Sequence, residues 1–130
     1  MKSVVVCSSS KFNKDVKKFV KGLKDLGVTV YRPLLETWYE QDWDSLTPEL
    51  QRVSVRGLTL GHFKKINKAD VVFLYNKGGY SGTSVSMELG YAVALEKPIY
   101  ALEKDTKEIP RDILLDDYVD TPEKLVEKLK

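Results

Sequence analysis

Short apolar runs alternate with stretches of helical periodicity along the whole chain. Two of these runs, within Lys2–Cys7 and Val71–Tyr75, lack polar alternation, which is typical of strands buried on both faces of a sheet. A third strand is expected at Pro98–Leu102, and two shorter ones at Val28–Tyr31 and Asp117–Val119. The pattern therefore predicts about five strands spread over the chain.

Between these strands, apolar residues recur at the three- and four-residue spacing of amphipathic helices. Helices are predicted at Lys14–Leu26, with Asn13 as the N-cap, and at Met87–Leu95. Two further helices, Pro48–Asn67 and Pro122–Leu129, each follow a threonine cap and begin with proline. Strands and helices thus alternate from one end of the sequence to the other.

Alternation of this kind is typical of a parallel sheet covered by helices on both faces. The chain has 130 residues, which is enough for one core, and it contains no internal repeat or linker. We therefore predict a single α/β domain over residues 1–130. Its expected architecture is a doubly wound, Rossmann-like parallel sheet of about five strands flanked by helices.

Charge and hydropathy narrow the classes of partner. Basic residues (21) nearly balance acidic ones (19), and the net charge of +2 gives no argument for nucleic-acid binding. No segment reaches the length needed to span a membrane, and the first apolar run is too short for a signal peptide. We expect a cytoplasmic protein whose partner is neither nucleic acid nor a membrane.

Cysteine and histidine each occur once, at Cys7 and His62. A single cysteine cannot form an intramolecular disulfide, which agrees with an intracellular location. Cys7 is interpreted as a strand-end residue, and nothing in the sequence suggests that it meets His62. Because no His and Cys cluster has metal-ligand spacing, we expect neither a catalytic thiol nor a bound metal.

The segment Ala69–Tyr100 is a complete strand–loop–helix–strand unit, and its loop, Asn76–Ser86, is rich in Gly, Ser and Thr. A parallel crossover places this loop at the carboxyl edge of the sheet, where open α/β sheets bind ligands. Glu88 is expected in the first helical turn, where a carboxylate is either functional or simply favoured by the helix dipole. The residues of this loop expected to contact a ligand are Gly79, Tyr80, Gly82, Ser84 and Ser86.

A second candidate anion site follows the first strand, where Ser9, Ser10 and Lys11 precede a helix. The alternative is plain turn chemistry, in which the hydroxyls bond only to nearby backbone. Neither this turn nor the Gly-rich loop has the GK[ST] ending of a P-loop, the GxGxxG dinucleotide fingerprint or a GxSxG elbow. No cofactor is therefore predicted.

Three segments resemble the nucleoside 2-deoxyribosyltransferase-like family, which includes deoxynucleoside 5'-monophosphate N-glycosidases. They are VVVCSSSKF, HFKKINKADVVFLYN and GYSGTSVSMELGYAVALEKPIY. The last is the most characteristic, because an ELGYA sequence precedes a KPI strand. The resemblance covers most of the chain and is weaker at Arg32–Arg56 and in the C-terminal tail.

The resemblance implies that Glu88 attacks the anomeric carbon of a nucleoside or nucleotide, forming a ribosyl-enzyme ester that another base or water captures. The same carboxylate could instead hold an anomeric water or a ribose hydroxyl. The resemblance also implies a homodimer or higher oligomer. Serines that match phosphate-binding positions of the monophosphate glycosidases are Ser9, Ser10, Ser84 and Ser86.

Three departures from the family pattern bear on activity. The first strand has valines, Val5 among them, where the family usually carries a tyrosine that sets the carboxylate. His62 stands where an aspartate is usual, and Gly82 or a neighbour where the transferases have another aspartate. His62 is either a proton donor in place of that aspartate or a structural histidine.

These departures leave two other functions open. One is a catalytically weak nucleoside- or nucleotide-binding protein of the same fold. The other is a phosphoribohydrolase of the lysine-decarboxylase-like type, which the missing PGGxGTxxE spacing disfavours. The irregular segment that holds Trp38, Tyr39 and Trp43 is expected to be a lid, a subunit interface or a staple to the core.

Overall fold

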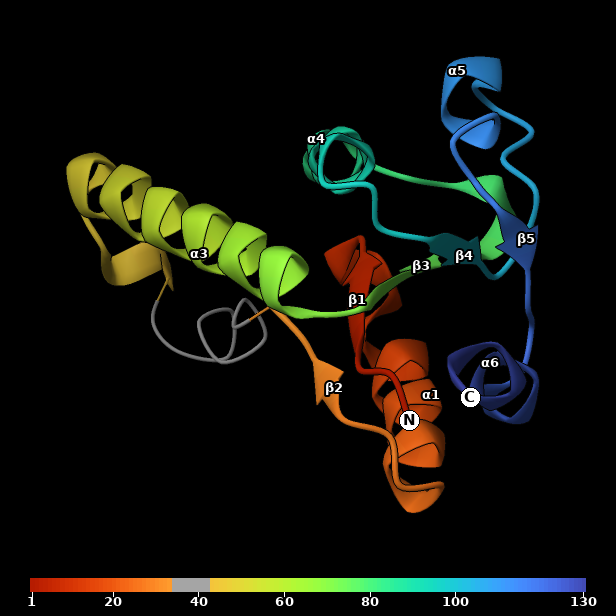
Figure 1. Ribbon diagram of the computed structural model, residues 1–130. Coiled ribbons are helices and arrows are strands. Elements are labelled where there is room, and N and C mark those ends of the chain that lie inside the picture. The colour runs from red at the N-terminus through yellow and green to blue at the C-terminus, as the bar shows by residue number, and fades with distance from the viewer. Residues whose placement is uncertain (34–42) are drawn as a thin grey trace.

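The computed structural model describes residues 1–33 and 43–130, which form an α/β domain around one parallel sheet (Figure 1). The sheet has five strands in the order β2-β1-β3-β4-β5, and every neighbouring pair is parallel. This confirms the predicted fold class. The strands are β1 (Val4–Ser8), β2 (Val30–Tyr31), β3 (Val71–Tyr75), β4 (Ile99–Ala101) and β5 (Asp117–Tyr118).

Helices connect successive strands, as the alternating pattern predicts. The two threonine–proline starts are confirmed: Thr47 Oγ1 accepts a hydrogen bond from the Leu50 amide and Thr121 Oγ1 from the Lys124 amide, both at 3.2 Å. The α-helices are α1 (Asn13–Asp25), α3 (Pro48–Lys68), α4 (Thr83–Ala94), α5 (Ile109–Asp112) and α6 (Pro122–Leu129), and short 3₁₀ helices lie at Ser10–Phe12, Trp43–Ser45 and Lys77–Gly79.

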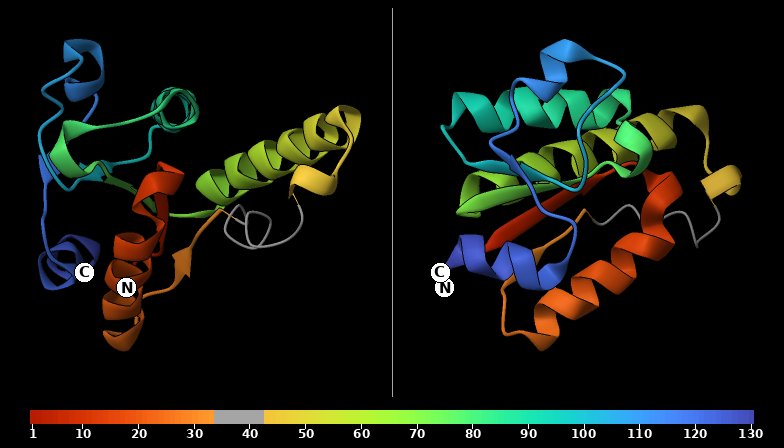
Figure 2. Two further views of the ribbon diagram at one scale, coloured as in Figure 1. Left: turned by 180° about the vertical axis from the view of Figure 1, so that it is seen from behind. Right: turned by 90° about the vertical axis from the view of Figure 1, so that its right-hand side faces the viewer.

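The sheet is covered on both faces, with α1 and α6 on one side and α3 and α4 on the other (Figure 2). Side chains of β1 alternate between the two layers, because successive residues of a strand point to opposite faces. Val4 and Val6 pack in the core under α1 and α6, whereas Val5 and Cys7 pack in the core under α3 and α4. This alternation places Cys7 on the same face as α3 and α4.

The start of α4 differs from the sequence-based expectation. The helix begins at Thr83, four residues before the expected Met87, so Glu88 lies in its second turn and not in its first. Val85 and Leu89 are buried and anchor this early start to the sheet. Similarly, Asn13 is the first residue of α1 and not its cap, because the 3₁₀ helix Ser10–Phe12 comes directly before it.

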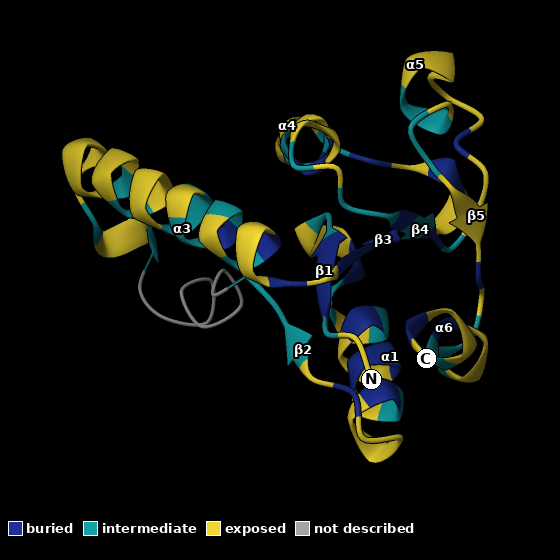
Figure 3. Ribbon diagram, viewed as in Figure 1, coloured by how far each residue is buried: buried dark blue, intermediate teal, exposed yellow. Residues whose placement is uncertain are grey.

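The first half of α3 extends beyond the sheet and is mostly exposed (Figure 3). Trp43 lies in the 3₁₀ helix that precedes α3, and its carbonyl accepts a hydrogen bond from Gln51 Nε2 at 3.1 Å. The other two aromatics of the segment expected to be a lid, a subunit interface or a staple, Trp38 and Tyr39, lie outside the described residues. None of the helices in the described ranges is long and apolar enough to cross a membrane.

Candidate functional site

The turn after β1 and the loop after β3 lie side by side at the carboxyl edge of the sheet. β1 and β3 are hydrogen-bonded neighbours, and their register pairs Ser8 with Tyr75 at this edge. Lys11 Nζ lies 3.5 Å from the centroid of the Tyr80 ring, a cation–π contact that joins the turn to the loop. The two segments chosen from the sequence as ligand sites therefore form one surface.

Glu88 lies at this edge with its side chain only 13% exposed. Burial raises the pKa of its carboxyl group from 4.5 to about 7, and a hydrogen bond from the Cys7 thiol opposes part of the rise. Its Oε2 atom has no hydrogen-bond partner among the described residues. A carboxyl group of this kind exchanges its proton near neutral pH, which suits an acid, a base or a nucleophile.

His62 faces Glu88 from α3, with its Nε2 atom 3.7 Å from Glu88 Oε2. The residue is buried, and burial together with the positive charge of Lys65 lowers the pKa of the imidazole from 6.5 to about 4. The ring is therefore neutral at physiological pH. A neutral imidazole beside Glu88 can form a hydrogen bond to the carboxyl group but supplies no compensating charge.

Cys7 completes this cluster, and the expectation that Cys7 and His62 lie apart is wrong. Cys7 Sγ is 3.4 Å from His62 Nε2, although 55 residues separate them in the sequence. The ligand-type atoms of Cys7, His62 and Glu88 all lie within 4.8 Å of one another. The fold therefore brings together three side chains that no spacing in the sequence connects.

The thiol of Cys7 is nevertheless a poor nucleophile in this setting. It is fully buried, and burial, the negative charge of Glu88 and a hydrogen bond to Glu88 together raise its pKa well above 9.0. The single thiol proton can be donated to the imidazole or to the carboxylate, both of which are in contact with it. Cys7 therefore serves the site as a hydrogen-bond donor.

The N-terminus of α4 offers backbone donors beside Glu88. Gly82 is the N-cap in an extended conformation, and no side chain caps the helix there. Free amides at a helix N-terminus, together with the helix dipole, bind anions. Ser84 is exposed in the first turn and, being four residues before Glu88, lies on the same face of the helix.

Some of the other predicted ligand residues have structural roles. Gly79 has φ +74°, and a Cβ at this position would lie 3.0 Å from the Lys104 carbonyl oxygen, so only glycine fits the close approach. The hydroxyl of Ser86 donates to the Gly82 carbonyl at 3.0 Å. That of Ser9 caps the 3₁₀ helix Ser10–Phe12, accepting from the amide of its second residue at 3.4 Å.

The remaining predicted residues of the turn and loop have accessible side chains. Ser10 and Lys11 are exposed beside the Gly-rich loop, and Tyr80 is 37% exposed above the Lys11 ammonium group. Together with Ser84 they supply exposed hydroxyl and ammonium groups on the turn after β1, the Gly-rich loop and the first turn of α4. The site thus has a buried part with the carboxyl group and an exposed, cationic part.

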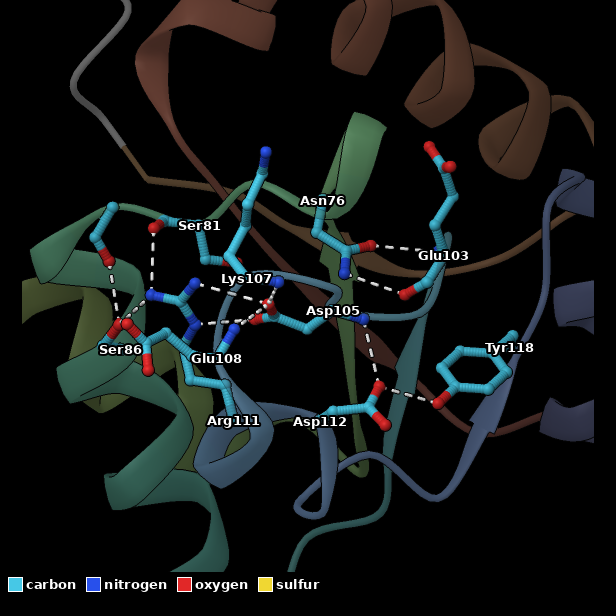
Figure 4. Close-up of polar contacts among 11 residues, drawn as sticks. Asn76, Ser81, Ser86, Glu103, Asp105, Lys107, Glu108, Arg111, Asp112 and Tyr118 are labelled. Carbon is cyan, nitrogen blue, oxygen red and sulfur yellow. Dashed lines mark hydrogen bonds and ion pairs between the residues drawn. The ribbon is translucent and has the colours of Figure 1, made fainter.

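A polar network behind the Gly-rich loop was not foreseen from the sequence (Figure 4). Arg111 Nε donates to Asp105 Oδ2 at 2.6 Å, and Arg111 Nη1 donates to the Ser81 carbonyl at 3.2 Å and to Ser86 Oγ at 3.3 Å. The guanidinium group therefore ties the loop and the first turn of α4 to the segment after β4. This fixes the elements that carry Ser84 and Glu88.

Asp105 is the buried anion of this network. Burial alone would raise its pKa, but hydrogen bonds from Arg111 and from the amides of Glu108 and Lys107 hold the pKa below its ordinary value. Asp105 accepts from these two amides at 2.9 Å each, as an aspartate does at the start of a turn or helix. The available signal in the sequence was an aspartate three residues before Glu108, the N-cap of α5.

Comparisons with known proteins agree with this architecture. The sequence model of the family described as nucleoside 2-deoxyribosyltransferase matches residues 6–127. A 2-deoxyribosyltransferase from Bacillus psychrosaccharolyticus is 24% identical, with a TM-score of 0.64 over 95% of this chain and 89% of that one. The CMP N-glycosidase BcmB of Clostridium botulinum is 18% identical, with a TM-score of 0.56 over 98% and 97% of the two chains.

A third similar structure, a conserved protein from Enterococcus faecalis V583, is 16% identical, with a TM-score of 0.64 over 99% of this chain and 98% of that one. No curated protein matches the chain significantly. The three structures share the fold along nearly the whole chain. The family match includes the end of β1, the whole of β3, the Gly-rich loop and α4.

Proposed function

The chain belongs to the nucleoside 2-deoxyribosyltransferase family, and on that premise we propose that it breaks the N-glycosidic bond of a nucleoside or nucleoside 5'-monophosphate, with Glu88 as the nucleophile. The observation that carries the proposal is the position of Glu88, a mostly buried carboxyl group with a pKa of about 7 at the carboxyl edge of the sheet. Such a group is half ionised at neutral pH and is shielded from water, which strengthens its interaction with a developing positive charge.

The reaction is written in two steps. A carboxylate oxygen of Glu88 forms a bond to the anomeric carbon while the bond from that carbon to the base breaks, and its electron pair leaves with the base, which takes a proton from water. A second base or a water molecule then attacks the same carbon and releases the carboxylate. This is the double displacement of retaining glycosidases, whose transition state resembles an oxocarbenium ion.

His62 and Cys7 have positioning roles in this proposal. His62 is neutral above about pH 4, so it does not neutralise the nucleophile and leaves the negative charge of Glu88 available. The two side chains hold the carboxyl group from one side, Cys7 from β1 and His62 from α3. They stand in place of the tyrosine and the aspartate that the family usually provides.

A nucleoside 5'-monophosphate is the favoured substrate class. The uncapped N-terminus of α4 and the exposed side chains of Ser10, Lys11 and Ser84 supply donors and a positive charge for a phosphate group. These groups are exposed, whereas the carboxyl group of Glu88 is mostly buried. One of the similar structures is a CMP N-glycosidase, which acts on a monophosphate by its name.

A homo-oligomer formed through α3 and α4 is part of the proposal. Exposed apolar side chains on these helices include Leu60, Met87 and Val93, and Gly90 has open space where a Cβ would be. Tyr91, by contrast, stacks on Phe63 within the chain at 4.8 Å between ring centroids. Light scattering after size-exclusion chromatography measures the mass; a monomer at all concentrations would contradict this part.

A binding protein without turnover is the second candidate, and one observation favours it. Val5 is fully buried in the core, so β1 presents no hydroxyl to Glu88 and only the weak donor Cys7 takes that place. Such a protein would be stabilised against heat by a nucleotide that it leaves intact.

A chromatographic screen separates these functions. The purified chain is incubated with pooled deoxynucleosides, ribonucleosides and their 5'-monophosphates, with and without an excess of a foreign base. Free base from the monophosphate pool in both conditions is the expected result and indicates a hydrolase. A new nucleoside only in the presence of the foreign base would indicate a transferase, and intact pools with thermal stabilisation would indicate a binding protein.

A further inference from the structure

We propose that Cys7, His62 and Glu88 form a binding site for a thiolate-preferring divalent cation such as Zn²⁺, and that the bound ion blocks Glu88. The binding half of this inference stands on the cluster alone. The inhibitory half rests on the proposed function, in which Glu88 has to be free to attack a sugar.

The distances within the cluster suit a small ion with tetrahedral coordination. Cys7 Sγ lies 3.4 Å from His62 Nε2, and His62 Nε2 lies 3.7 Å from Glu88 Oε2. Ligand bonds of about 2.0–2.3 Å at tetrahedral angles place neighbouring ligand atoms roughly 3.3–3.6 Å apart. Two of the three pairs are thus already spaced for one ion, and the third pair, Cys7 and Glu88, lies within 4.8 Å. Each ligand comes from a different element: β1, α3 and α4.

The chemistry of the three ligands selects the kind of ion. Sulfur and imidazole nitrogen favour Zn²⁺ and related transition ions over Mg²⁺ and Ca²⁺, which prefer oxygen. Binding of the ion displaces the thiol proton of Cys7 to solvent, together with the proton of Glu88 where that group is protonated. The resulting thiolate and carboxylate carry two negative charges, which a divalent ion neutralises in a buried place. His62 is neutral and can bind through Nε2 without losing a proton.

The cluster is accessible through one of its members. Glu88 is the one member of the cluster with an accessible side chain, so an ion enters from the side where the proposed substrate binds. Three protein ligands leave one tetrahedral position for water or another small ligand. His62 also lines a pocket of about 60 Å³ with Gly57 and Gly61, large enough for a water molecule.

Such a water would accept a hydrogen bond from the second ring nitrogen of a metal-bound imidazole, as metal-binding histidines usually require. Nδ1 of His62 has no hydrogen-bond partner among the described residues. An ion held by the cluster neutralises the charge of the Glu88 carboxylate and occupies the oxygen that would attack the sugar. Nucleotide cleavage and metal binding are therefore mutually exclusive at this site.

Cobalt(II) is the probe of choice, because its complex with a thiolate gives a charge-transfer absorption and its tetrahedral complexes absorb strongly in the visible range. The full chain is treated with chelator, desalted and titrated with CoCl₂, and the bound ion is then displaced with ZnCl₂. Cys7 is the only cysteine and His62 the only histidine in the chain, so a thiolate–cobalt band reports this site alone. The expected result is one equivalent of Co²⁺ with both absorptions, displaced by Zn²⁺.

Variants test the ligand set. Cys7→Ser is expected to abolish the charge-transfer band, and Glu88→Gln to weaken Co²⁺ affinity by at least about tenfold while keeping that band. Glu127→Gln, at an exposed carboxylate of α6, is the matched control and is expected to change neither. Circular dichroism verifies folding, and Glu88→Gln keeps the test valid should Cys7→Ser fail to fold.

Two outcomes would overturn the proposal. One is the absence of a thiolate–cobalt band with the folded wild-type chain, and the other is an affinity that Glu88→Gln leaves unchanged. The activity assay tests separately whether the bound ion blocks Glu88. Inhibition by equimolar Zn²⁺ that a chelator reverses would support this part of the proposal. Full activity of the zinc-loaded protein would overturn it. Absence of turnover in chelated protein would contradict the proposed function and leave the cobalt result intact.

Discussion

Nε2 of His62 lies 3.7 Å from Oε2 of Glu88, and burial moves the pKa values of the two groups in opposite directions. The pKa of the imidazole falls to about 4 and that of the carboxyl group rises to about 7, which reverses their ordinary order. Between these values both groups are neutral, so the pair does not become an ion pair in this range. Above pH 7 the carboxylate stands beside an uncharged ring.

This order of titration predicts the pH dependence of catalysis. Glu88 has to be ionised to attack, so kcat/KM of the metal-free enzyme is expected to fall about tenfold per pH unit below 7 and to level off above it. Initial rates of base release in the presence of chelator, from pH 5 to 9, measure the profile. A profile that is flat between pH 5 and 7 would mean that the ionised form of Glu88 is not required.

Stability is expected to depend on pH through the same carboxyl group. The folded pKa of about 7 lies above the ordinary 4.5, so the contribution of Glu88 is fully present below pH 4.5 and is lost as pH rises through 7. Glu88→Gln removes this loss. The free energy of unfolding of the variant minus that of wild type is therefore expected to increase by on the order of 2 kcal/mol as pH rises from 5 to 8.

Urea unfolding at the two pH values, with chelator present, measures this difference. His62 contributes in the opposite sense, because its folded pKa of about 4 is below 6.5 and its contribution is lost as pH falls through 4. His62 is present in both proteins, so its effect cancels in the comparison. A difference between variant and wild type that is constant with pH would contradict the prediction.

The sequence predicted the sheet because its strands are short β-branched runs and its helices have clear apolar faces. It could not predict that Cys7 meets His62. The apolar pattern assigns Cys7 to a buried strand. That α3 packs on the face of the sheet to which the Cys7 side chain points follows only from the tertiary structure. The cluster therefore depends on a contact between residues distant in sequence, which local patterns do not encode.

The loop between β3 and α4 shows a second limit. Ser and Thr are typical of turns, so the segment Thr83–Ser86 was interpreted as loop, whereas burial of Val85 and Leu89 makes it helical. The role of Arg111 was missed for a similar reason. A polar, irregular stretch gives no sign of which backbone carbonyl or carboxylate, 30 or 6 residues away, an arginine will bind.

The network around Arg111 is expected to stabilise the fold and the site together. Arg111→Gln leaves the Asp105 carboxylate buried without its cation, which is expected to cost about 2 kcal/mol in free energy of unfolding. Because the guanidinium also holds the Ser81 carbonyl and Ser86, KM is expected to rise as well. Urea unfolding and steady-state kinetics measure the two effects.

The double variant Asp105→Asn/Arg111→Gln is the control for this prediction. An asparagine at position 105 still accepts hydrogen bonds from the amides of Lys107 and Glu108 but carries no charge. Part of the stability lost in Arg111→Gln is therefore expected to return. The single variant Asp105→Asn is measured as well. A loss of stability in the double variant equal to the sum of the losses in the two single variants would show that the two side chains are not energetically coupled.

Lys11 is expected to distinguish monophosphates from free nucleosides. Lys11→Gln removes the positive charge that lies over the ring of Tyr80, two residues before Gly82, the N-cap of α4. A hydrogen bond to a charged group contributes on the order of 1.5 kcal/mol. Preference for the monophosphate, measured as a ratio of kcat/KM values, is expected to fall about tenfold. Lys14→Gln, an exposed lysine on α1, changes the net charge equally and is expected to leave the ratio unchanged.

The most direct test of the central claim compares wild type with Glu88→Gln on the best substrate from the screen. Release of base is followed by chromatography, and binding of the intact substrate is measured by calorimetry. The proposed mechanism predicts a loss of at least about a thousandfold in kcat with retained binding, because glutamine preserves shape but cannot form the ester. A Glu88→Gln variant that releases base at a rate close to that of wild type would contradict the assignment of Glu88 as the nucleophile.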